Sequence, residues 1–126
     1  MMNDRGIYLT RPRGRIKKPI DTAKDRIKWV AKVNEDYIKF GKSERPLKAR
    51  YRDYQRIFGD DVIFEPIIIL NDKEKLRAFE DHIKNIFPNN FKISNPGSSR
   101  KLEWMTGITF EEAKEKIIEE YKKFNN

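Results

Sequence analysis

The stretch from Val62 to Leu70, VIFEPIIIL, leaves this chain few ways to fold. Its branched and aromatic side chains suit the pleated surface of a β-sheet, and a short apolar run of this kind is typical of a buried strand. A chain of 126 residues has room for one hydrophobic core. We therefore expect one folded domain in which helices and further strands pack around a sheet that contains this segment.

Several kinds of site are excluded by residues that the chain lacks. Without cysteine it forms no disulfide, no thiolate zinc site and no cysteine nucleophile. With His82 as its one histidine, it forms no multi-histidine metal site. No apolar run approaches the roughly 18 residues of a membrane-spanning helix, and no signal-peptide pattern is visible. We expect an intracellular protein that is not secreted and has no membrane partner.

The chain is basic, and its positive charge is concentrated near the N-terminus. Its 28 Lys and Arg residues against 20 Asp and Glu residues give +8, a balance typical of proteins that bind nucleic acid. The first 25 residues carry seven basic and three acidic residues, 7 − 3 = +4, without apolar periodicity. We predict a flexible basic arm over residues 1–25 and a folded domain over 26–126. A solvated basic surface is the alternative interpretation of the charge.

The folded domain is expected to begin with a β-hairpin over residues 26–42. Apolar residues alternate from Arg26 to Val33, Asn34-Glu35 suits a turn, and Asp36 to Lys42 suits the return strand. Gly41, near the end of the hairpin, suits a close approach of another group to the backbone.

Three helices are expected beside this hairpin and the strand at 62–70. Their expected first turns or caps are at Pro46, Asn71 and Thr109. The first helix ends before Gly59, and the last is expected to bury Phe124. Residues 89–100 are expected to form a loop, and Leu102 to Met105 a short edge strand. The prediction is a small α+β fold with a hairpin-led antiparallel sheet flanked by helices.

Four short motifs occur along this predicted order of elements. Lys39-Phe40-Gly41-Lys42-Ser43 is followed by Arg50, nine residues past the glycine, and then by Glu80 on an expected helix. Glu103-Trp104-Met105 then leads into the last helix. In these motifs the chain resembles the GIY-YIG endonucleases, and specifically their divergent phage and large-virus branch. The resemblance covers residues 26–123.

The resemblance implies a GIY-YIG-like domain that hydrolyses phosphodiester bonds of DNA with one divalent ion, Mg²⁺ or Mn²⁺. Glu80 would hold that ion, Arg50 would clamp the phosphate, and Lys42 would add a second positive charge. Gly41 and Ser43 would contact DNA. The same resemblance implies a protein of the cytoplasm or nucleus, in a cell or in a virus-infected host.

The tyrosines of the family's two name-giving motifs are substituted in the predicted hairpin. Trp29 stands at the first position and Lys39 at the second. A literal Gly6-Ile7-Tyr8 lies too far ahead of the second motif for a hairpin, so we interpret it as a coincidence. The candidate general bases are Tyr37, which shares a strand face with Lys39, and Lys39 itself. Further candidates are Tyr51, Tyr54 and His82.

Each candidate also has a purely structural interpretation. Glu80 is explained equally by an ion pair with Lys84, one helical turn later. Arg50 is explained by an ion pair with Asp53. Trp29 lies on an apolar strand face and suits the core, and His82 lies beside the helix stripe and suits the surface.

The predicted arm carries a motif of its own. Residues 11–18, RPRGRIKK, are similar to an AT-hook, with Ile16 in place of the second proline. A narrow A·T minor groove attracts arginine, and Gly14 lets the backbone reach the groove floor. The expected DNA contacts are Arg11, Arg13, Gly14, Arg15, Lys17 and Lys18. A generic basic tail is the alternative.

Three functions follow from these patterns. The first is a metal-dependent DNA endonuclease whose arm prefers A·T-rich double-stranded DNA. The second is a catalytically degenerate GIY-YIG-fold protein that only binds DNA, which the substituted tyrosines favour. RNA binding comes last, because the chain lacks aromatic base-stacking motifs. The oligomeric state and the cleavage sequence stay open.

Overall fold

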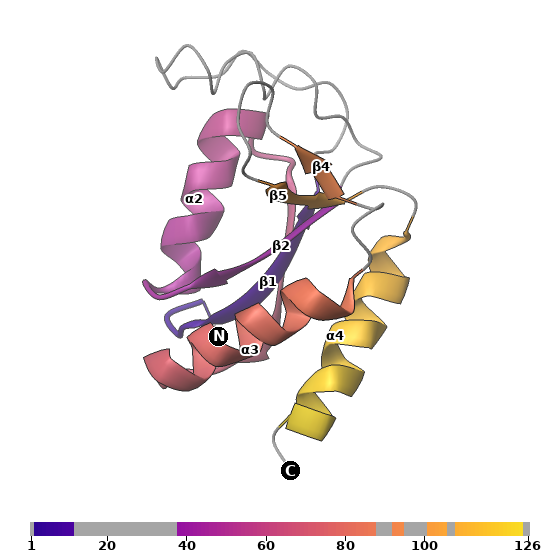
Figure 1. The fold of residues 1–126 in the computed structure, drawn as a ribbon. Coiled ribbons are helices and arrows are strands. Elements are labelled where there is room, and N and C mark those ends of the chain that lie inside the picture. Colours follow the sequence, from indigo (N-terminus) through magenta and orange to yellow (C-terminus); the bar gives the residue numbers. More distant parts are fainter. Residues whose placement is uncertain (1, 12–37, 88–91, 95–100, 106–107, 125–126) are drawn as a thin grey trace.

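The computed structural model describes residues 2–11, 38–87, 92–94, 101–105 and 108–124, shown in colour in Figure 1. The strands are β1 (Gly6–Arg11), β2 (Ile38–Ser43), β3 (Ile63–Ile69), β4 (Lys92–Ser94) and β5 (Lys101–Met105). The helices are α2 (Leu47–Phe58), α3 (Lys73–Ile86) and α4 (Phe110–Phe124). Within these ranges, no helix has the length and apolar character needed to cross a membrane.

The strands form one antiparallel sheet in the order β3-β1-β2-β5-β4. β1 pairs with β2 on one side and β3 on the other, and β5 lies between β2 and β4. Because β2 and β3 are both antiparallel to β1, they run parallel to each other, and α2 makes the crossover between them. The predicted α+β class and the antiparallel sheet are confirmed.

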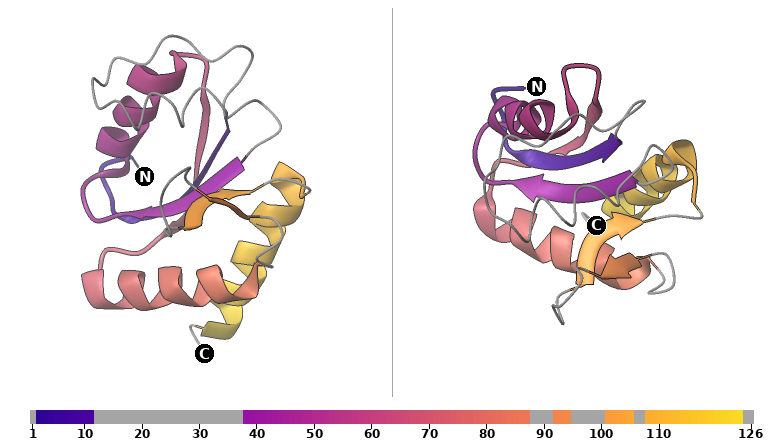
Figure 2. Two further views of the ribbon diagram at one scale, coloured as in Figure 1. Left: turned by 45° about the horizontal axis from the view of Figure 1, so that its top comes forward. Right: turned by 90° about the horizontal axis from the view of Figure 1, so that it is seen from above.

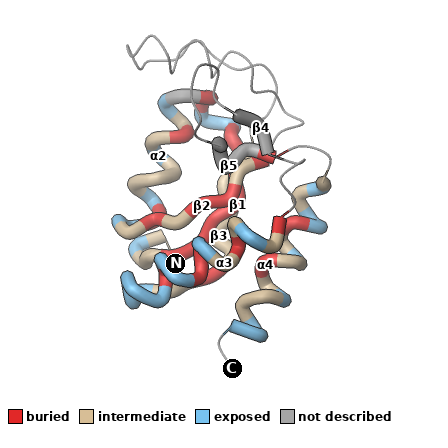
Figure 3. The backbone as a smooth tube through the Cα atoms, viewed as in Figure 1, coloured by how far each residue is buried: buried red, intermediate tan, exposed pale blue. Residues whose placement is uncertain are grey.

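Helices cover both faces of this sheet, with α2 on one face and α3 and α4 on the other (Figure 2). Side chains of β1 alternate between the two layers, so Tyr8 joins the α2 side and Ile7 and Leu9 the α3–α4 side. β1 is consequently buried along almost its whole length (Figure 3). The core on the α2 side is Tyr8, Leu47, Tyr54, Phe58 and Val62. The larger core on the other side includes Leu9, Phe40, Leu76, Phe79, Ile83, Ala113 and Ile117.

The position of β1 corrects the predicted arm and the predicted hairpin. Residues 6–11 are not part of an arm, because they form an inner strand of the sheet. β2 takes β1 as its partner on one side and β5 on the other, so the predicted hairpin partner, 26–33, is not its neighbour there. That segment and the turn at 34–35 lie outside the described residues. The prediction was wrong because it required a short connection, whereas β1 and β2 are joined through residues 12–37.

The helices and the strand at 62–70 follow their predictions closely. α2 begins after Pro46 and ends at Gly59, whose φ of 101° favours glycine. The cap of α3 is Asp72 rather than Asn71, since the Asp72 side chain accepts a hydrogen bond of 3.1 Å from the Lys75 backbone N–H. Asn71 instead accepts a hydrogen bond from the backbone N–H of Arg5 and so joins the start of β1 to the start of α3.

The C-terminal third holds one confirmed prediction and three corrections. Thr109 caps α4 as predicted, accepting a hydrogen bond of 3.0 Å from the backbone N–H of Glu112. Residues 92–94 form β4, within the predicted loop, and this strand takes the edge of the sheet. β5 therefore lies inside the sheet and is not an edge strand. Phe124, which was expected to be buried, is the last residue of α4 and is 38% exposed.

Candidate functional site

Tyr8 lies over Gly41, the glycine of the motif on β2. The two residues face each other in the ladder between β1 and β2. A Cβ atom added to Gly41 would lie 2.5 Å from the Tyr8 hydroxyl oxygen and 2.8 Å from its ring carbon Cζ. The space that glycine leaves at position 41 is therefore filled by the tyrosine ring.

Tyr8 and Tyr54 form a buried pair of phenols on the α2 side of the sheet. Their hydroxyl oxygens lie 2.8 Å apart, and their rings meet edge to face with centroids 5.6 Å apart. Burial raises the pKa of Tyr8 well above its ordinary value of 10.0, and the neighbouring Tyr54 raises it further. Tyr8 is consequently a neutral phenol at pH 7 and can donate a hydrogen bond.

Two cations accompany this pair and complete what we call the tyrosine cluster: Tyr8, Lys39, Arg50 and Tyr54. Lys39 Nζ lies 5.3 Å from the centroid of the Tyr54 ring. Lys39 and Arg50 both act to lower the pKa of Tyr8, but burial outweighs them. Arg50 is 37% exposed at its side chain, with one guanidinium nitrogen 3.9 Å from the Asp53 carboxylate and with a buried Nε that has no hydrogen-bond partner.

Glu80 meets β2 from the opposite layer. Its Oε2 accepts a hydrogen bond of 2.8 Å from the backbone N–H of Lys42, and its Oε1 lies 3.6 Å from Lys42 Nζ. Lys84 Nζ lies 3.4 Å from the same Oε1, as the structural interpretation of Glu80 expects. The Glu80 side chain is 7% exposed, and its carboxylate is held by one peptide N–H and two ammonium groups.

Glu44 extends this group into what we call the carboxylate cluster: Lys42, Glu44, Arg77 and Glu80. Lys42 Nζ lies 3.1 Å from a Glu44 carboxylate oxygen, so its ammonium group bridges Glu44 and Glu80. Arg77 donates a hydrogen bond of 2.6 Å to the other Glu44 oxygen. Hydrogen bonds from Arg77 and then Lys42 lower the pKa of Glu44 from its ordinary value of 4.5 to about 2.

The two clusters lie on opposite faces of one short segment of β2. Consecutive strand residues point to opposite faces, and Gly41 faces the α2 layer whereas Lys42 pairs with the core residue Ile7. The predicted association of Glu80 with Lys42 is present. Arg50 makes its contacts with the α2 side, and in the described part of the chain it does not touch Glu80.

The other predicted site residues are divided between described and undescribed segments. Ser43 is buried, and its hydroxyl donates a hydrogen bond of 2.7 Å to the carbonyl of Arg45, ahead of α2. His82 pairs with Glu120 of α4 at 3.0 Å and so joins two helices. Arg11 is the last residue of β1 and pairs with Ile63. Tyr37, Arg13, Gly14, Arg15, Lys17 and Lys18 lie outside the described residues, as do Trp29 and the rest of the predicted first hairpin strand.

The carboxylate cluster bears on whether a divalent ion fits beside Glu80. The described segments contain no group of three His, Cys, Asp or Glu side chains suited to a metal. Mg²⁺ commonly uses one or two carboxylates and completes its shell with water and phosphate oxygens. Among the described residues, Oε1 of Glu80 is held by the ammonium groups of Lys42 and Lys84, whose side chains are 26% and 40% exposed. A divalent ion at Oε1 would take the place of these ammonium groups, and Glu80 and Glu44 are the carboxylates that would hold it.

Tyr8 belongs to the tyrosine cluster, although the Gly6-Ile7-Tyr8 that contains it was interpreted from the sequence as a coincidence. Its signal was the literal Gly6-Ile7-Tyr8, which forms the start of β1 and lies beside the second motif. β1 pairs with β2 despite the separation along the chain, since an antiparallel pair can close over a long connection at modest extra entropy. Tyr54, which completes the phenol pair, was named only as a further candidate base.

Comparison of the chain with protein-family models, with curated proteins and with solved structures finds no match.

The contact between Tyr8 and Gly41 predicts a strong coupling between substitutions. Gly41→Ala should cost about 1–3 kcal/mol of unfolding free energy, because its Cβ overlaps the Tyr8 ring. In a Tyr8→Leu background, which lacks that ring, the same substitution should cost much less. Urea unfolding of the four proteins in a double-mutant cycle measures the difference. Lys48→Ala, at an exposed position of α2, is the control: its cost in unfolding free energy should add to that of either substitution without coupling. Strictly additive costs for Gly41→Ala and Tyr8→Leu would contradict the contact.

The lowered pKa of Glu44 predicts an acid-sensitive contribution to stability. A carboxylate whose pKa falls on folding stabilises the fold above its unfolded pKa, and this contribution disappears as the pH falls through the folded pKa. The stability advantage of the wild type over Glu44→Gln should therefore be full above pH 4.5 and vanish by about pH 2. Chemical unfolding across this range, with exposed Glu115→Gln as the control, measures it. A pH-independent difference would contradict the ion pairs of Glu44.

Proposed function

We propose that this chain is a GIY-YIG-like endonuclease that hydrolyses DNA with one divalent ion, Mg²⁺ or Mn²⁺. The observation that carries the proposal is the place of Tyr8, which lies on the first strand of the sheet and directly over Gly41. That is the placement the family resemblance implies for the tyrosine of the first motif. Arg50 on α2 and Glu80 on α3 flank the same segment of β2.

The residues of the two clusters would divide the work of phosphodiester hydrolysis. Arg50 presents a partly exposed guanidinium whose planar fork suits a phosphate. Lys42 lies on the other face of β2 beside Glu80, and once it leaves the carboxylates it would add a positive charge to phosphate oxygens bound on that face. An ion bound at Glu80 would supply charge stabilisation and activation of water.

The phenols have a narrower role. Because Tyr8 is neutral and buried, it suits hydrogen-bond donation and the positioning of groups near Gly41 better than abstraction of a proton. Tyr54 is its hydrogen-bond partner and lies under Lys39. Tyr37, Lys39 and Tyr54 are the remaining candidates for a general base.

One observation favours the second candidate function, DNA binding without cleavage. Tyr8 is 2% exposed and Glu80 is 5% exposed, and both have partners within the protein. A carboxylate that satisfies a backbone N–H and two ammonium groups has a structural role even without metal. This candidate predicts binding of DNA and no hydrolysis.

We include in the proposal the AT-hook-like segment at residues 11–18. Its arginines and Gly14 suit the narrow minor groove of A·T-rich double-stranded DNA. Arg11 is the last residue of β1, and residues 12–18 lie outside the described residues. The segment would add affinity on the substrate and leave the chemistry to the clusters on β2.

Glu80→Gln tests the catalytic proposal. Glutamine keeps an oxygen for the Lys42 N–H but removes the charge that would hold a divalent ion. Nicking of supercoiled plasmid with Mg²⁺ or Mn²⁺ should fall by at least roughly 100-fold. Duplex binding in EDTA should stay equal or tighten, because one negative charge is gone.

The matched control for this experiment is Glu119→Gln, which makes the same change at an exposed position of α4. It should cleave as the wild type does. Full activity of Glu80→Gln would refute the role of Glu80. No cleavage by the wild type with either ion, together with DNA binding, would leave the binding-only function.

The arm is tested in place, because removal of residues 1–18 would also remove β1. We expect combined alanine substitution of Arg13, Arg15, Lys17 and Lys18 to lower the salt slope of DNA binding by about 0.9 for each lost phosphate contact. The affinity loss should be larger on A·T-rich than on G·C-rich duplexes in fluorescence anisotropy. Equal losses would indicate a generic basic tail, and unchanged binding would exclude the arm as a DNA contact.

A further inference from the structure

The outward side of α2 carries a second concentration of positive charge, which adjoins the tyrosine cluster through the contact of Arg50 with Asp53. From Arg45 to Phe58 the chain has five basic residues and one acidic residue, Asp53. Ala49, Asp53 and Arg56 follow one another at intervals of three or four residues and so share one side of the helix. Arg45 lies two residues ahead of α2 and reaches this side through its hydrogen bond to Asp53. Arg45, Arg52 and Arg56 are all exposed.

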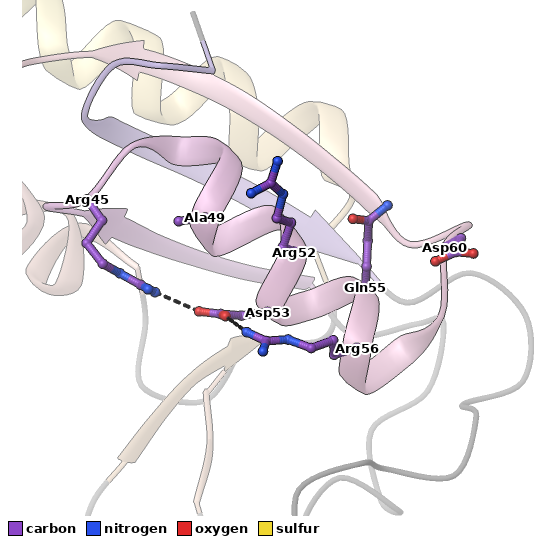
Figure 4. Close-up of a pocket in the computed structure, with 7 residues that line it drawn as sticks. All are labelled: Arg45, Ala49, Arg52, Asp53, Gln55, Arg56 and Asp60. Carbon is purple, nitrogen blue, oxygen red and sulfur yellow. Dashed lines mark hydrogen bonds and ion pairs between the residues drawn. The ribbon is translucent and has the colours of Figure 1, made fainter.

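Asp53 holds two of these arginines in place. Arg45 donates a hydrogen bond of 2.7 Å to one of its oxygens, and Arg56 donates to the other (Figure 4). Burial raises the pKa of Asp53, but the hydrogen bonds from Arg45 and Arg56 outweigh it and leave that pKa below its ordinary value. The carboxylate thus stays charged and aligns both guanidinium groups at neutral pH.

Most of the guanidinium donors remain available to a ligand. Each arginine has five N–H donors, and Arg45 and Arg56 are 56% and 65% exposed at their side chains. Asp53 is only 26% exposed, so it lies beneath the arginines that it aligns. Orientation by a carboxylate lowers the conformational entropy that a flexible arginine loses on binding.

These side chains surround an open hollow of about 530 Å³ on the outside of α2. Ala49 lies among the longer side chains of the helix, and its single methyl group leaves the space between them unfilled (Figure 4). Arg45, Arg52 and Arg56 supply three positive charges to the lining, and Asp53 and Asp60 supply two negative ones.

We propose that Arg45 and Arg56, aligned by Asp53, and the neighbouring Arg52 form a binding surface for the phosphate backbone of DNA on the outward side of α2. The 12 residues of α2 span about 18 Å at the rise of an α-helix, and Arg45 lies two residues ahead of them. Over that length one strand of a duplex presents about five phosphates, so several arginines can be engaged at once. Arginine forks suit phosphate oxygens geometrically as well as electrostatically.

This surface deepens the proposed function, and it rests on the part of that function which makes DNA the substrate. It requires neither cleavage nor metal. An acidic protein segment is the competing occupant, but isolated carboxylates match a group of three exposed arginines less well than a continuous polyanion does.

The test is duplex binding in EDTA by the full-length chain, measured by fluorescence anisotropy across a salt series. Combined Arg45→Gln, Arg52→Gln and Arg56→Gln should weaken binding at least about tenfold near 0.15 M salt. The slope of log affinity against log salt should fall by about 2.7, which is 0.9 for each of three contacts. Replacement of the same three residues by lysine should keep most of the slope, because the charges remain.

The matched control removes three exposed lysines of α3 and α4, Lys73, Lys122 and Lys123, on the other side of the sheet. It makes the same change in net charge and should lower the slope far less. Equal losses of affinity and salt slope in the two triple variants would overturn the proposal. It would also be overturned if the α2 triple variant, with an unchanged thermal unfolding transition, bound DNA as the wild type does. If the α2 variant loses binding as expected but the wild type cleaves no DNA, the surface stands and only the nuclease proposal fails.

Discussion

The packing of Tyr8 against Gly41 determines how the rest of this protein is arranged. The ring reaches the backbone of β2 because position 41 has no Cβ, and it brings its hydroxyl to Tyr54 of α2. The same residue stacks on Phe64 of β3 with ring centroids 4.8 Å apart. One side chain therefore joins three strands and the crossover helix, and it holds Arg50 and Lys39 beside a buried phenol.

A second constraint acts on the opposite face of β2. In the described part of the chain, β5 pairs with β2 at Ile38 and Lys39, and the backbone N–H of Lys42 donates instead to Glu80. This hydrogen bond fixes α3 against the sheet, and the ion pairs of Lys42 and Glu44 extend the connection to Arg77. A carboxylate proposed to bind a metal is thus also part of the structure, which explains why both catalytic and purely structural interpretations fit Glu80.

Local patterns predicted some elements well. The β-branched run became β3, Pro46 and Gly59 bounded α2, and Thr109 capped α4. The family resemblance assigned Glu80, Lys42 and Arg50 to one site. Glu80 and Lys42 form an ion pair and a backbone hydrogen bond. Arg50 lies with Tyr8 and Asp53 instead, because residues 41 and 42 face opposite sides of the sheet. The neighbours of β2 were predicted wrongly, since strand pairing depends on contacts between distant segments.

The sequence by itself determined the α+β class, the helix boundaries and the residue types available for chemistry, since capping, propensity and apolar periodicity act within a few residues. Only the tertiary structure decided that Gly6-Ile7-Tyr8 belongs to an inner strand and that Asp53 aligns two arginines. Gly6-Ile7-Tyr8 forms an inner strand because both faces of β1 are buried, by α2 on one side and by α3 and α4 on the other. A short segment with one tyrosine and two aliphatic residues shows that role only when its partners have been brought together.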